Sequence, residues 1–508
     1  MESSFRKIAA AVPRVCLADP DANAIEMIRL LNEAAGNGAG LVVFPKDALT
    51  GATCGDLMKQ TVLREAACRA AEKVYEAARQ SGVAAVICHD DYPEGITIVQ
   101  DAQFELVTAH EKRARKFAEM SRGGFLIYCS AGYGESTQDG VCSGDAMIFR
   151  DGRLLASSER FSTCSQIICA NTDDEGVLID TTPAPDTLKK HPFVPECPEE
   201  LAARCKEVMG IQTTGIMRRM EHIHCKTAII GISGGLDSTL ALLVVCKAAD
   251  RLGWDRKQII AVTMPGFGTT DRTHDNAWAL MQALGVSCRE ISIAPSVTQH
   301  FIDINHDMAV HDATYENGQA RERTQILMDL ANQENGFVVG TGDLSELALG
   351  WATFNGDHMS MYDVNCDVPK TMMQAMVRWA ADNDFSDVKD TLLDIVDTPI
   401  SPELIPEQKT EDLVGPYELH DFFLYHFIRH GRAPREILAL AMDAFGGAYD
   451  KDTITKWLRT FLKRFFSQQF KRSCSADGPR IGSVCLSPRG AWAMPSDANS
   501  TTWLKDLD

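Results

Sequence analysis

Residues 226–238 read KTAIIGISGGLDS, an apolar run followed by a glycine-rich turn and the start of a helical pattern. The adjacent glycines Gly234 and Gly235 let the backbone turn tightly without a Cβ in the way, so its N–H groups can surround a phosphate. The helix that follows adds the positive end of its dipole. The lysine that a Walker loop requires is missing. The stretch therefore predicts a strand–loop–helix unit that binds phosphate by another loop type, although such a turn can also simply cap a core helix.

The flanking sequence repeats this alternation of strand and helix. Apolar runs at 258–265 and 336–342 are typical of buried strands, and the patterns at 239–250, 276–285 and 319–333 are typical of helices. Strands alternating with helices of this length predict a parallel sheet, whose binding sites lie at the carboxyl ends of the strands. The fold class is therefore α/β, with a nucleotide-binding parallel sheet in the C-terminal part of the chain.

The N-terminal part has its own α/β pattern. Strands are expected within 38–45 and 83–89, and a hairpin over 145–161 turns at Asp151-Gly152. Residues 181–200 contain five prolines and no hydrophobic period, which is typical of a linker. We therefore expect an N-terminal domain over 1–180, a linker over 181–200 and a larger domain over 201–508, whose end from Ser473 is expected to be irregular.

Composition narrows the classes of function. Of the 508 residues, 70 are acidic and 50 are basic, giving a formal charge of -20, which argues against a broad nucleic-acid interface. No apolar run is long enough to span a membrane, and the N-terminus lacks a signal-peptide core. None of the 16 cysteines forms a Cys-x-x-Cys pair, so neither a thiolate zinc site nor a thioredoxin motif is expected. These features predict a cytoplasmic protein with reduced thiols.

Several long motifs carry a family resemblance. SGGLDS is the signature of the ATP-pyrophosphatase superfamily, and TMPGFGTTDRT (263–273), VVGTGDLSELALGWATFNGDHMSMYDVN (338–365) and KTEDLVGPYELHDFFLYHF (409–427) resemble the synthetase domain of glutamine-dependent NAD synthetases. The resemblance runs from about residue 200 to about 498 and implies an adenine nucleotide alpha-hydrolase-like fold. It also implies amidation of deamido-NAD to NAD through an acyl-adenylate, with ATP and Mg²⁺ used, AMP and pyrophosphate released, and a homo-oligomeric enzyme.

The resemblance assigns roles to residues at matching positions. Asp237 and Lys370 (of VPKT) are the implied catalytic residues, and Asp237 and Glu346 the implied metal ligands. The implied ATP-binding residues are Gly231, Ile232, Ser233, Gly234, Gly235, Leu236, Asp237, Ser238, Met264 and Thr341. The implied deamido-NAD-binding residues are Asn317, Glu346, Trp351, Ala352, Thr353, Phe354 and Lys471.

Simpler structural interpretations exist for some of these residues. Asp343 and Glu346 lie three residues apart and could cap the following helix. Trp351 and Phe354 could be core aromatics. A helix carrying Arg321 and Arg323 could place both on its solvated face, with one of them reaching a phosphate.

The N-terminal domain departs from the family. LVVFPKDALTGATCGDLM (41–58) resembles the early part of a nitrilase-like glutaminase domain, but Lys46 stands where the family has its glutamate base. Too few residues follow for a complete four-layer domain, and a block that includes the cysteine nucleophile strand is expected to be missing. The family's triad consists of a glutamate, a lysine and a cysteine, with the lysine before the cysteine. Cys88 and Lys112 could be mistaken for the last two members, but here the cysteine comes first. The expectation is a degenerate domain and a synthase that uses ammonia.

Three alternatives remain open. The chain could hydrolyse glutamine with a compact but working domain, and it could be a non-catalytic relative that binds a dinucleotide. An RNA-modifying enzyme of the same superfamily would favour a basic surface and paired cysteines, and the sequence has neither.

Overall fold

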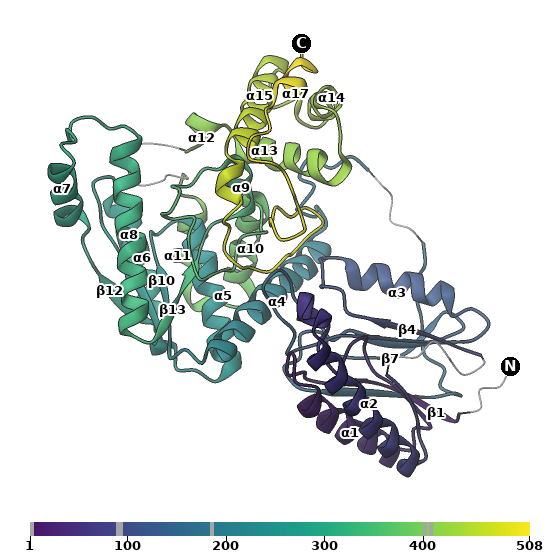
Figure 1. Ribbon diagram of the computed structural model, residues 1–508. Helices are drawn as coiled ribbons and strands as arrows, with labels where there is room; N and C mark the ends of the chain where they lie inside the picture. Colours follow the sequence, from purple (N-terminus) through teal and green to yellow (C-terminus); the bar gives the residue numbers. More distant parts are fainter. Residues whose placement is uncertain (1–4, 88–94, 183–186, 400–403, 406–409) are drawn as a thin grey trace. The chain divides into compact units, whose positions relative to one another are not determined.

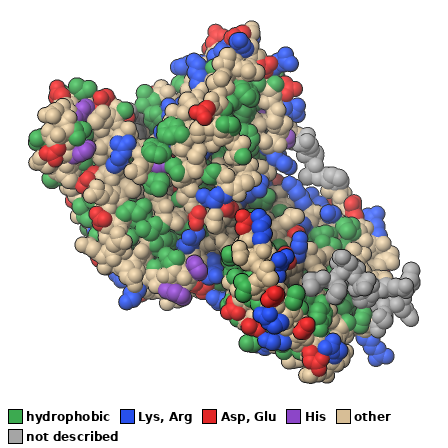
Figure 2. All heavy atoms as spheres, viewed as in Figure 1, with side chains coloured by type: hydrophobic (Ala, Val, Ile, Leu, Met, Phe, Trp, Pro, Cys, Tyr) green, Lys and Arg blue, Asp and Glu red, His purple; other side chains and the backbone are tan. Residues whose placement is uncertain are grey.

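The computed structural model describes residues 5–87, 95–182, 187–399, 404–405 and 410–508. The chain divides into two compact units, Met1–Pro185 and Asp186–Asp508. Among the described residues, no helix is both long and apolar enough to cross a membrane, and every cysteine is a free thiol. Acidic and basic side chains are intermixed on the face shown in Figure 2.

The larger unit is built on one parallel sheet of five strands. The strand order is β12 (Ser287–Glu290), β11 (Ile259–Thr263), β10 (Thr227–Gly231), β13 (Gly336–Gly340) and β14 (Tyr362–Asp363). Every pairing is parallel, so the expected α/β class and its parallel sheet are confirmed. The chain order reverses between β10 and β13, and side chains from adjacent strand ends can converge at such a point.

Helices cover both faces of this sheet (Figure 1). Ile229, Val262 and Val338 pack one face against α7 (Ala294–Asp303) and α8 (Ala313–Gln333). On the opposite side lies α5 (Leu236–Leu252), which buries most of its length, as expected for a helix between two layers. The remaining helices of this region are α4 (Pro198–Ile223), which begins inside the expected linker, η2 (Arg256–Gln258) and α6 (Asp271–Ala283).

A helical region completes the larger unit. Its core is rich in aromatic residues, including Phe422, Phe423 and Phe461, which lie among 22 buried residues from several helices. Phe422 and Phe423, which belong to the 409–427 motif, are therefore core residues. The helices are α9 (Leu344–Leu349), α10 (Lys370–Asn383), η3 (Ser386–Val388), α11 (Lys389–Val396), α12 (Thr410–Val414), α13 (Tyr417–Leu424), η4 (Tyr425–Arg429), α14 (Pro434–Phe445), α15 (Lys451–Ser467), α16 (Gln469–Arg472) and α17 (Thr501–Lys505).

The C-terminal segment from Ser473 is mostly irregular, as expected, but it is part of the packed structure. Val484 and Leu486 are buried in the aromatic core, and Ile481 is also buried. The backbone N–H groups of Ile481 and Gly482 donate to the carboxylate of Asp367 at 2.7 and 3.0 Å.

The smaller unit contains two sheets packed face to face. One has the strand order β3 (Ala84–Val86), β2 (Leu41–Val43), β1 (Lys7–Val12) and β8 (Gln166–Asn171). The other has the order β4 (Ile96–Asp101), β5 (Phe125–Ser130), β6 (Ala146–Arg150), β7 (Arg153–Ser157) and β9 (Val177–Leu178). Apolar side chains from both sheets form the core between them. The β6–β7 hairpin turns at Asp151-Gly152, both at positive φ, as expected.

Helices form the outer layers of this unit. The helices α1 (Pro20–Gly36) and α2 (Thr61–Ser81) pack on the first sheet, and η1 (Ala52–Lys59) precedes α2. A single helix, α3 (Ala109–Met120), packs on the second sheet through Phe117. The sequence predicts that this unit is too short for four layers, but the structure contains two helical layers and two sheets. The described part of the fourth layer is a single helix.

Candidate active site

The glycine-rich loop joins β10 to α5 with a tightly packed backbone. Gly234 has a φ of +87°, and a Cβ built there would lie 2.1 Å from the carbonyl oxygen of Thr273. The hydroxyl of Ser233 accepts the N–H of Gly235 at 3.1 Å, and Ser238 accepts the N–H of Ser233 at 3.3 Å. The loop thus holds its compact form through its own glycine and serine residues.

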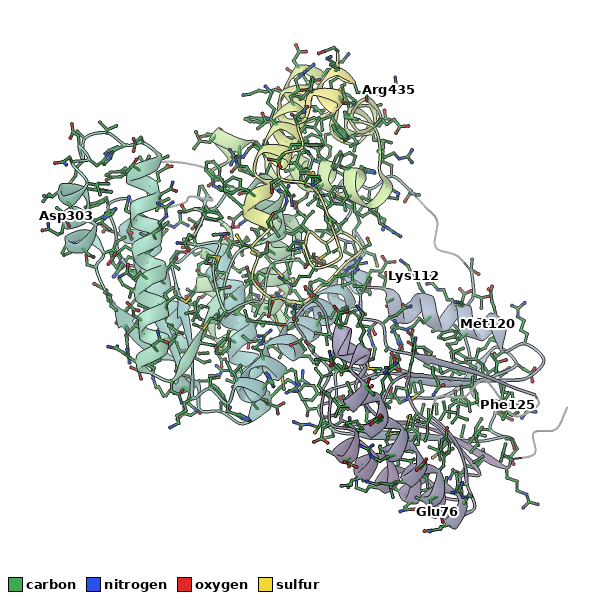
Figure 3. The ribbon with its side chains drawn as sticks, in the orientation of Figure 1. Glu76, Lys112, Met120, Phe125, Asp303 and Arg435 are labelled. Atoms are coloured by element: carbon green, nitrogen blue, oxygen red, sulfur yellow. The ribbon has the colours of Figure 1, made fainter. Side chains whose placement is uncertain are left out.

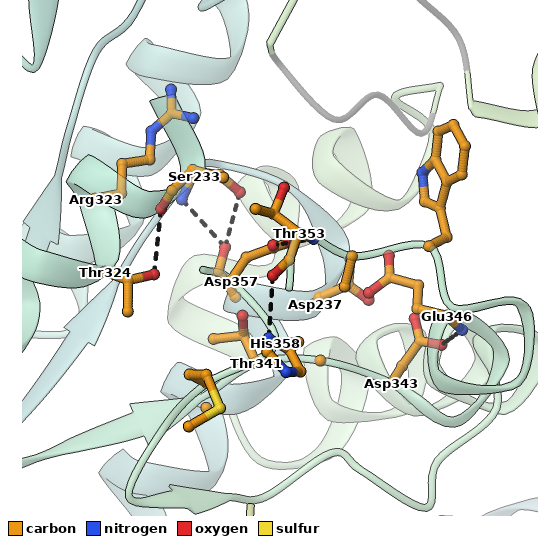
Figure 4. A pocket seen from close by; sticks show the side chains of 18 of the residues that line it. Ser233, Asp237, Arg323, Thr324, Thr341, Asp343, Glu346, Thr353, Asp357 and His358 are labelled. Atoms are coloured by element: carbon orange, nitrogen blue, oxygen red, sulfur yellow. Dashed lines mark hydrogen bonds between the residues drawn. The ribbon is translucent and has the colours of Figure 1, made fainter. Parts of the chain in front are cut away.

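A pocket of about 470 Å³ opens beside this loop at the carboxyl ends of β10, β11 and β13 (Figure 4). Most residues expected to bind ligand line it, namely Gly231, Ile232, Ser233, Asp237, Ser238, Met264, Asn317, Thr341, Glu346, Trp351, Ala352, Thr353 and Lys471. Gly234, Gly235 and Leu236 belong to the loop but are not lining residues, and Phe354 and Lys370 are not lining residues either.

Acidic side chains converge at one end of the pocket. Carboxylate oxygens of Asp237, Asp343 and Glu346 lie within 4.8 Å of one another. Asp237 comes from the first turn of α5, while Asp343 caps α9 and Glu346 lies in its first turn. Carboxylate oxygens are the ligands that Mg²⁺ prefers, so this group fits a magnesium ion. Sequence reasoning assigned Asp237 and Glu346 to a metal and explained Asp343 as a cap; the structure places all three together.

Lys370 lies against these carboxylates and is fully buried. Its Nζ is 2.6 Å from Asp237 and 3.1 Å from Glu346, and it also pairs with Asp343. Burial alone would lower the pKa of Lys370, but the surrounding carboxylates raise it well above its ordinary value. Burial in turn raises the pKa of both Asp343 and Glu346. The group therefore combines three acids with one ammonium.

Another part of the pocket lining is basic and aromatic. Lys471 donates to the carbonyl oxygens of Gly350 at 2.8 Å and Ala352 at 2.6 Å. The guanidinium of Arg464 donates to Leu349 O at 2.9 Å and lies 5.0 Å from the ring centroid of Trp351. Lys471, Arg464 and Trp351 all line the pocket, so this part of the lining suits an anionic ligand that contains a ring.

Phe354 takes a different position from Trp351. It is 41% exposed, and its ring lies 5.2 Å from that of His358 and 5.4 Å from that of Phe470. Asn317 instead contacts Thr353, whose hydroxyl donates to the Asn317 side chain at 2.7 Å. The structure thus brings Asn317, Trp351 and Thr353 to the pocket but leaves Phe354 on its outside.

Several lining residues were not expected from the sequence. They include Asp357, which accepts the N–H of Thr353 at 2.6 Å, and the adjacent His358. Of the two arginines that the sequence offered as candidates to reach a phosphate, Arg323 lines the pocket and donates to Met264 O at 3.1 Å, while Arg321 is not a lining residue. Arg323 could have been singled out from its position on its helix. One face of α8 lines the pocket, and Arg323 shares that face with Asn317, Ala320, Thr324 and Leu327.

In the smaller unit, the two described lysines that were compared with glutaminase positions are both exposed. Lys46 is exposed just after β2, and Lys112 lies on the exposed side of α3 (Figure 3). Cys88 lies outside the described residues. The side chain of Gln100 on β4 donates to Phe44 O at 2.7 Å and to Ile87 O at 3.0 Å. The Gln100 side-chain amide therefore links the residue just after β2 to the residue just after β3.

The larger unit matches a known protein family. Residues 209–459 match the family model for NAD synthase. The glutamine-dependent NAD(+) synthetase of Mycobacterium leprae is 38% identical over 446 residues, an alignment covering 75% of this chain and 66% of that protein. The chain thus spans just under two thirds of the length of this relative.

Two solved structures share the fold. The glutamine-dependent NAD(+) synthetase of Cytophaga hutchinsonii aligns with a TM-score of 0.79 at 16% identity, over 99% of this chain and 100% of that one. The glutamine-dependent NAD+ synthetase of Acinetobacter baumannii, in complex with adenosine diphosphate, aligns with a TM-score of 0.64 at 19% identity, over 96% and 98%.

Proposed function

Because the chain belongs to the NAD synthase family, we propose that its larger unit amidates deamido-NAD to NAD with ATP. A carboxylate is a poor electrophile, so ATP first converts it to an acyl-adenylate and pyrophosphate leaves. Ammonia then attacks the acyl carbon, forming the amide and releasing AMP. The observation that carries the proposal is one pocket lined by the SGGLDS loop, by acidic residues beside Lys370, and by Trp351 and Lys471.

Each part of the pocket has a place in this reaction. The loop N–H groups and the start of α5 would bind the phosphates of ATP. A solved structure of the same fold is a complex with adenosine diphosphate, which supports an adenine nucleotide as a ligand of this fold. A magnesium ion held by Asp237, Asp343 and Glu346 would offset phosphate charge. Trp351, Arg464 and Lys471 would hold the dinucleotide through its ring and its anionic groups.

The products test the chemistry. We expect one AMP and one pyrophosphate for each NAD formed, whereas ADP and phosphate would rule out the adenylate. Asp237→Asn should lower kcat by roughly a hundredfold or more, because its charge acts mainly in the transition state. Asp275→Asn is the matched control, since that side chain is 80% exposed. Wild-type turnover in Asp237→Asn would remove the proposed role of this carboxylate.

We also infer that ammonia, more than glutamine, supplies the nitrogen. Lys46 cannot take a proton from a thiol as a glutamate would, and Gln100 already binds the carbonyl groups beyond β2 and β3. The names of the relatives favour the second candidate, hydrolysis of glutamine in the smaller unit. Release of glutamate in step with NAD, abolished by Cys88→Ala, would establish that second candidate. A homo-oligomeric state and a cytoplasmic location remain predictions.

A further inference from the structure

Lys370 occupies the centre of the carboxylate group. It is the first residue of α10, its side chain is 1% exposed, and its ammonium contacts Asp237, Asp343 and Glu346. The ring centroid of Tyr417 lies 5.2 Å from the same ammonium. The three carboxylates that suit a divalent cation are therefore the same three that bind this lysine.

The backbone of Lys370 is fixed independently of its ammonium. Its N–H donates to the hydroxyl of Ser345 at 2.9 Å. That hydroxyl donates to Asp421, and Asp421 also accepts the N–H and hydroxyl of Thr371 at 2.9 and 2.7 Å. Asp421 thus joins the start of α9, which carries Asp343 and Glu346, to the start of α10, which carries the lysine. The four-carbon side chain can change position while this anchor stays intact.

Two cations cannot share this group without strong repulsion. The carboxylate oxygens lie within 4.8 Å of one another, so an ion coordinated by all three would approach the place of the ammonium. Like charges at such a separation repel strongly in a partly buried site. The ammonium would therefore have to move as the ion binds, and the phosphates of a nucleotide are anions with which it could then pair.

We propose that Lys370 is a resident counter-ion that competes with the divalent cation for Asp237, Asp343 and Glu346. The consequence is an order of binding: the cation binds weakly by itself and enters together with the nucleotide, whose phosphates receive the lysine. This inference rests on the proposed function for the identity of the nucleotide. The competition itself involves only these four side chains, so it can be measured without catalysis.

The test measures Mn²⁺ binding to the full chain without ATP, by electron paramagnetic resonance of the free ion. Lys370→Gln keeps N–H donors toward the carboxylates but removes the charge, so Mn²⁺ should bind on the order of tenfold more tightly than to wild type. Lys389→Met is the control, because that lysine is exposed and pairs with Asp382 on the surface. Equal Mn²⁺ affinity in wild type and Lys370→Gln overturns the proposal.

A second variant retains all four charges in case Lys370→Gln does not fold. Asp421→Asn weakens the anchor of Ser345 and Thr371 and should raise Mn²⁺ affinity by roughly two- to fivefold. An affinity at or below that of wild type would contradict the competition. Because no ATP is present, the Mn²⁺ affinities do not depend on NAD synthesis. If the variants showed the competition but the protein had no synthase activity, the proposed function would be overturned while the counter-ion role would stand.

Discussion

Asp343 accepts the backbone N–H of Glu346 at 2.8 Å with one carboxylate oxygen, while the other faces Lys370. A single side chain therefore caps the N-terminus of α9 and completes the acidic group of the pocket. The two interpretations of this residue, a helix cap and a metal ligand, are compatible.

This double role can be separated by substitution. Asp343→Asn keeps a capping oxygen but loses the charge, so the free energy of unfolding should change by no more than about 1 kcal/mol. Turnover should nevertheless fall on the order of a hundredfold. Asp450→Asn is the matched control, since Asp450 caps α15 through the N–H of Thr453. Equal loss of activity in both variants would refute a special role for Asp343.

The conformation of the SGGLDS loop depends more on Gly234 than on Gly235. Gly234→Ala would place a Cβ 2.1 Å from Thr273 O at a positive φ, and should lower the free energy of unfolding by roughly 2 kcal/mol or more. Gly235→Ala would meet only the Ser233 hydroxyl at 3.2 Å, at a negative φ, and should cost about 1 kcal/mol or less. Thermal unfolding of both variants measures the difference, and equal effects would disprove it.

Two neighbouring aromatic residues should differ in substrate binding. Trp351→Ala removes a lining ring that also contacts Arg464, and should raise the KM for deamido-NAD by roughly tenfold. Phe354→Ala removes a half-exposed ring outside the pocket lining and should change that KM by less than about threefold. Steady-state kinetics with saturating ATP checks both, and the reverse ranking would show that the dinucleotide lies on the other side of this segment.

A buried acid should make stability depend on pH. Burial raises the pKa of Asp367 from 3.8 to about 7, so its contribution is favourable below about pH 4 and is lost as pH rises through 7. Asp367→Asn should therefore be more stable than wild type at pH 8, by roughly 2 kcal/mol, and the advantage should shrink below pH 7 and vanish toward pH 4. Chemical denaturation at several pH values measures it, with the exposed Asp412→Asn as control; a constant difference would contradict the raised pKa.

The sequence predicted the features that depend on local pattern. The strand before Gly231, the helix after Gly235 and the hairpin at Asp151-Gly152 each follow from apolar runs and turn residues, and the structure contains all of them. Asp343 was missed as a ligand because capping already explains it locally, and its approach to Asp237 is a tertiary contact. The different positions of Trp351 and Phe354 depend on the turn after α9, where Gly350 has a φ of +57°. Periodicity does not encode that turn.

The proposed reaction makes NAD from deamido-NAD with ammonia as nitrogen donor. The most direct measurement supplies purified protein with deamido-NAD, ATP and Mg²⁺, and compares NAD formation with ammonium or glutamine as the sole nitrogen source. We expect NAD and AMP with ammonium, and little or no NAD and no glutamate with glutamine. Efficient synthesis with glutamine, or no NAD from ammonium at any concentration, would contradict this expectation.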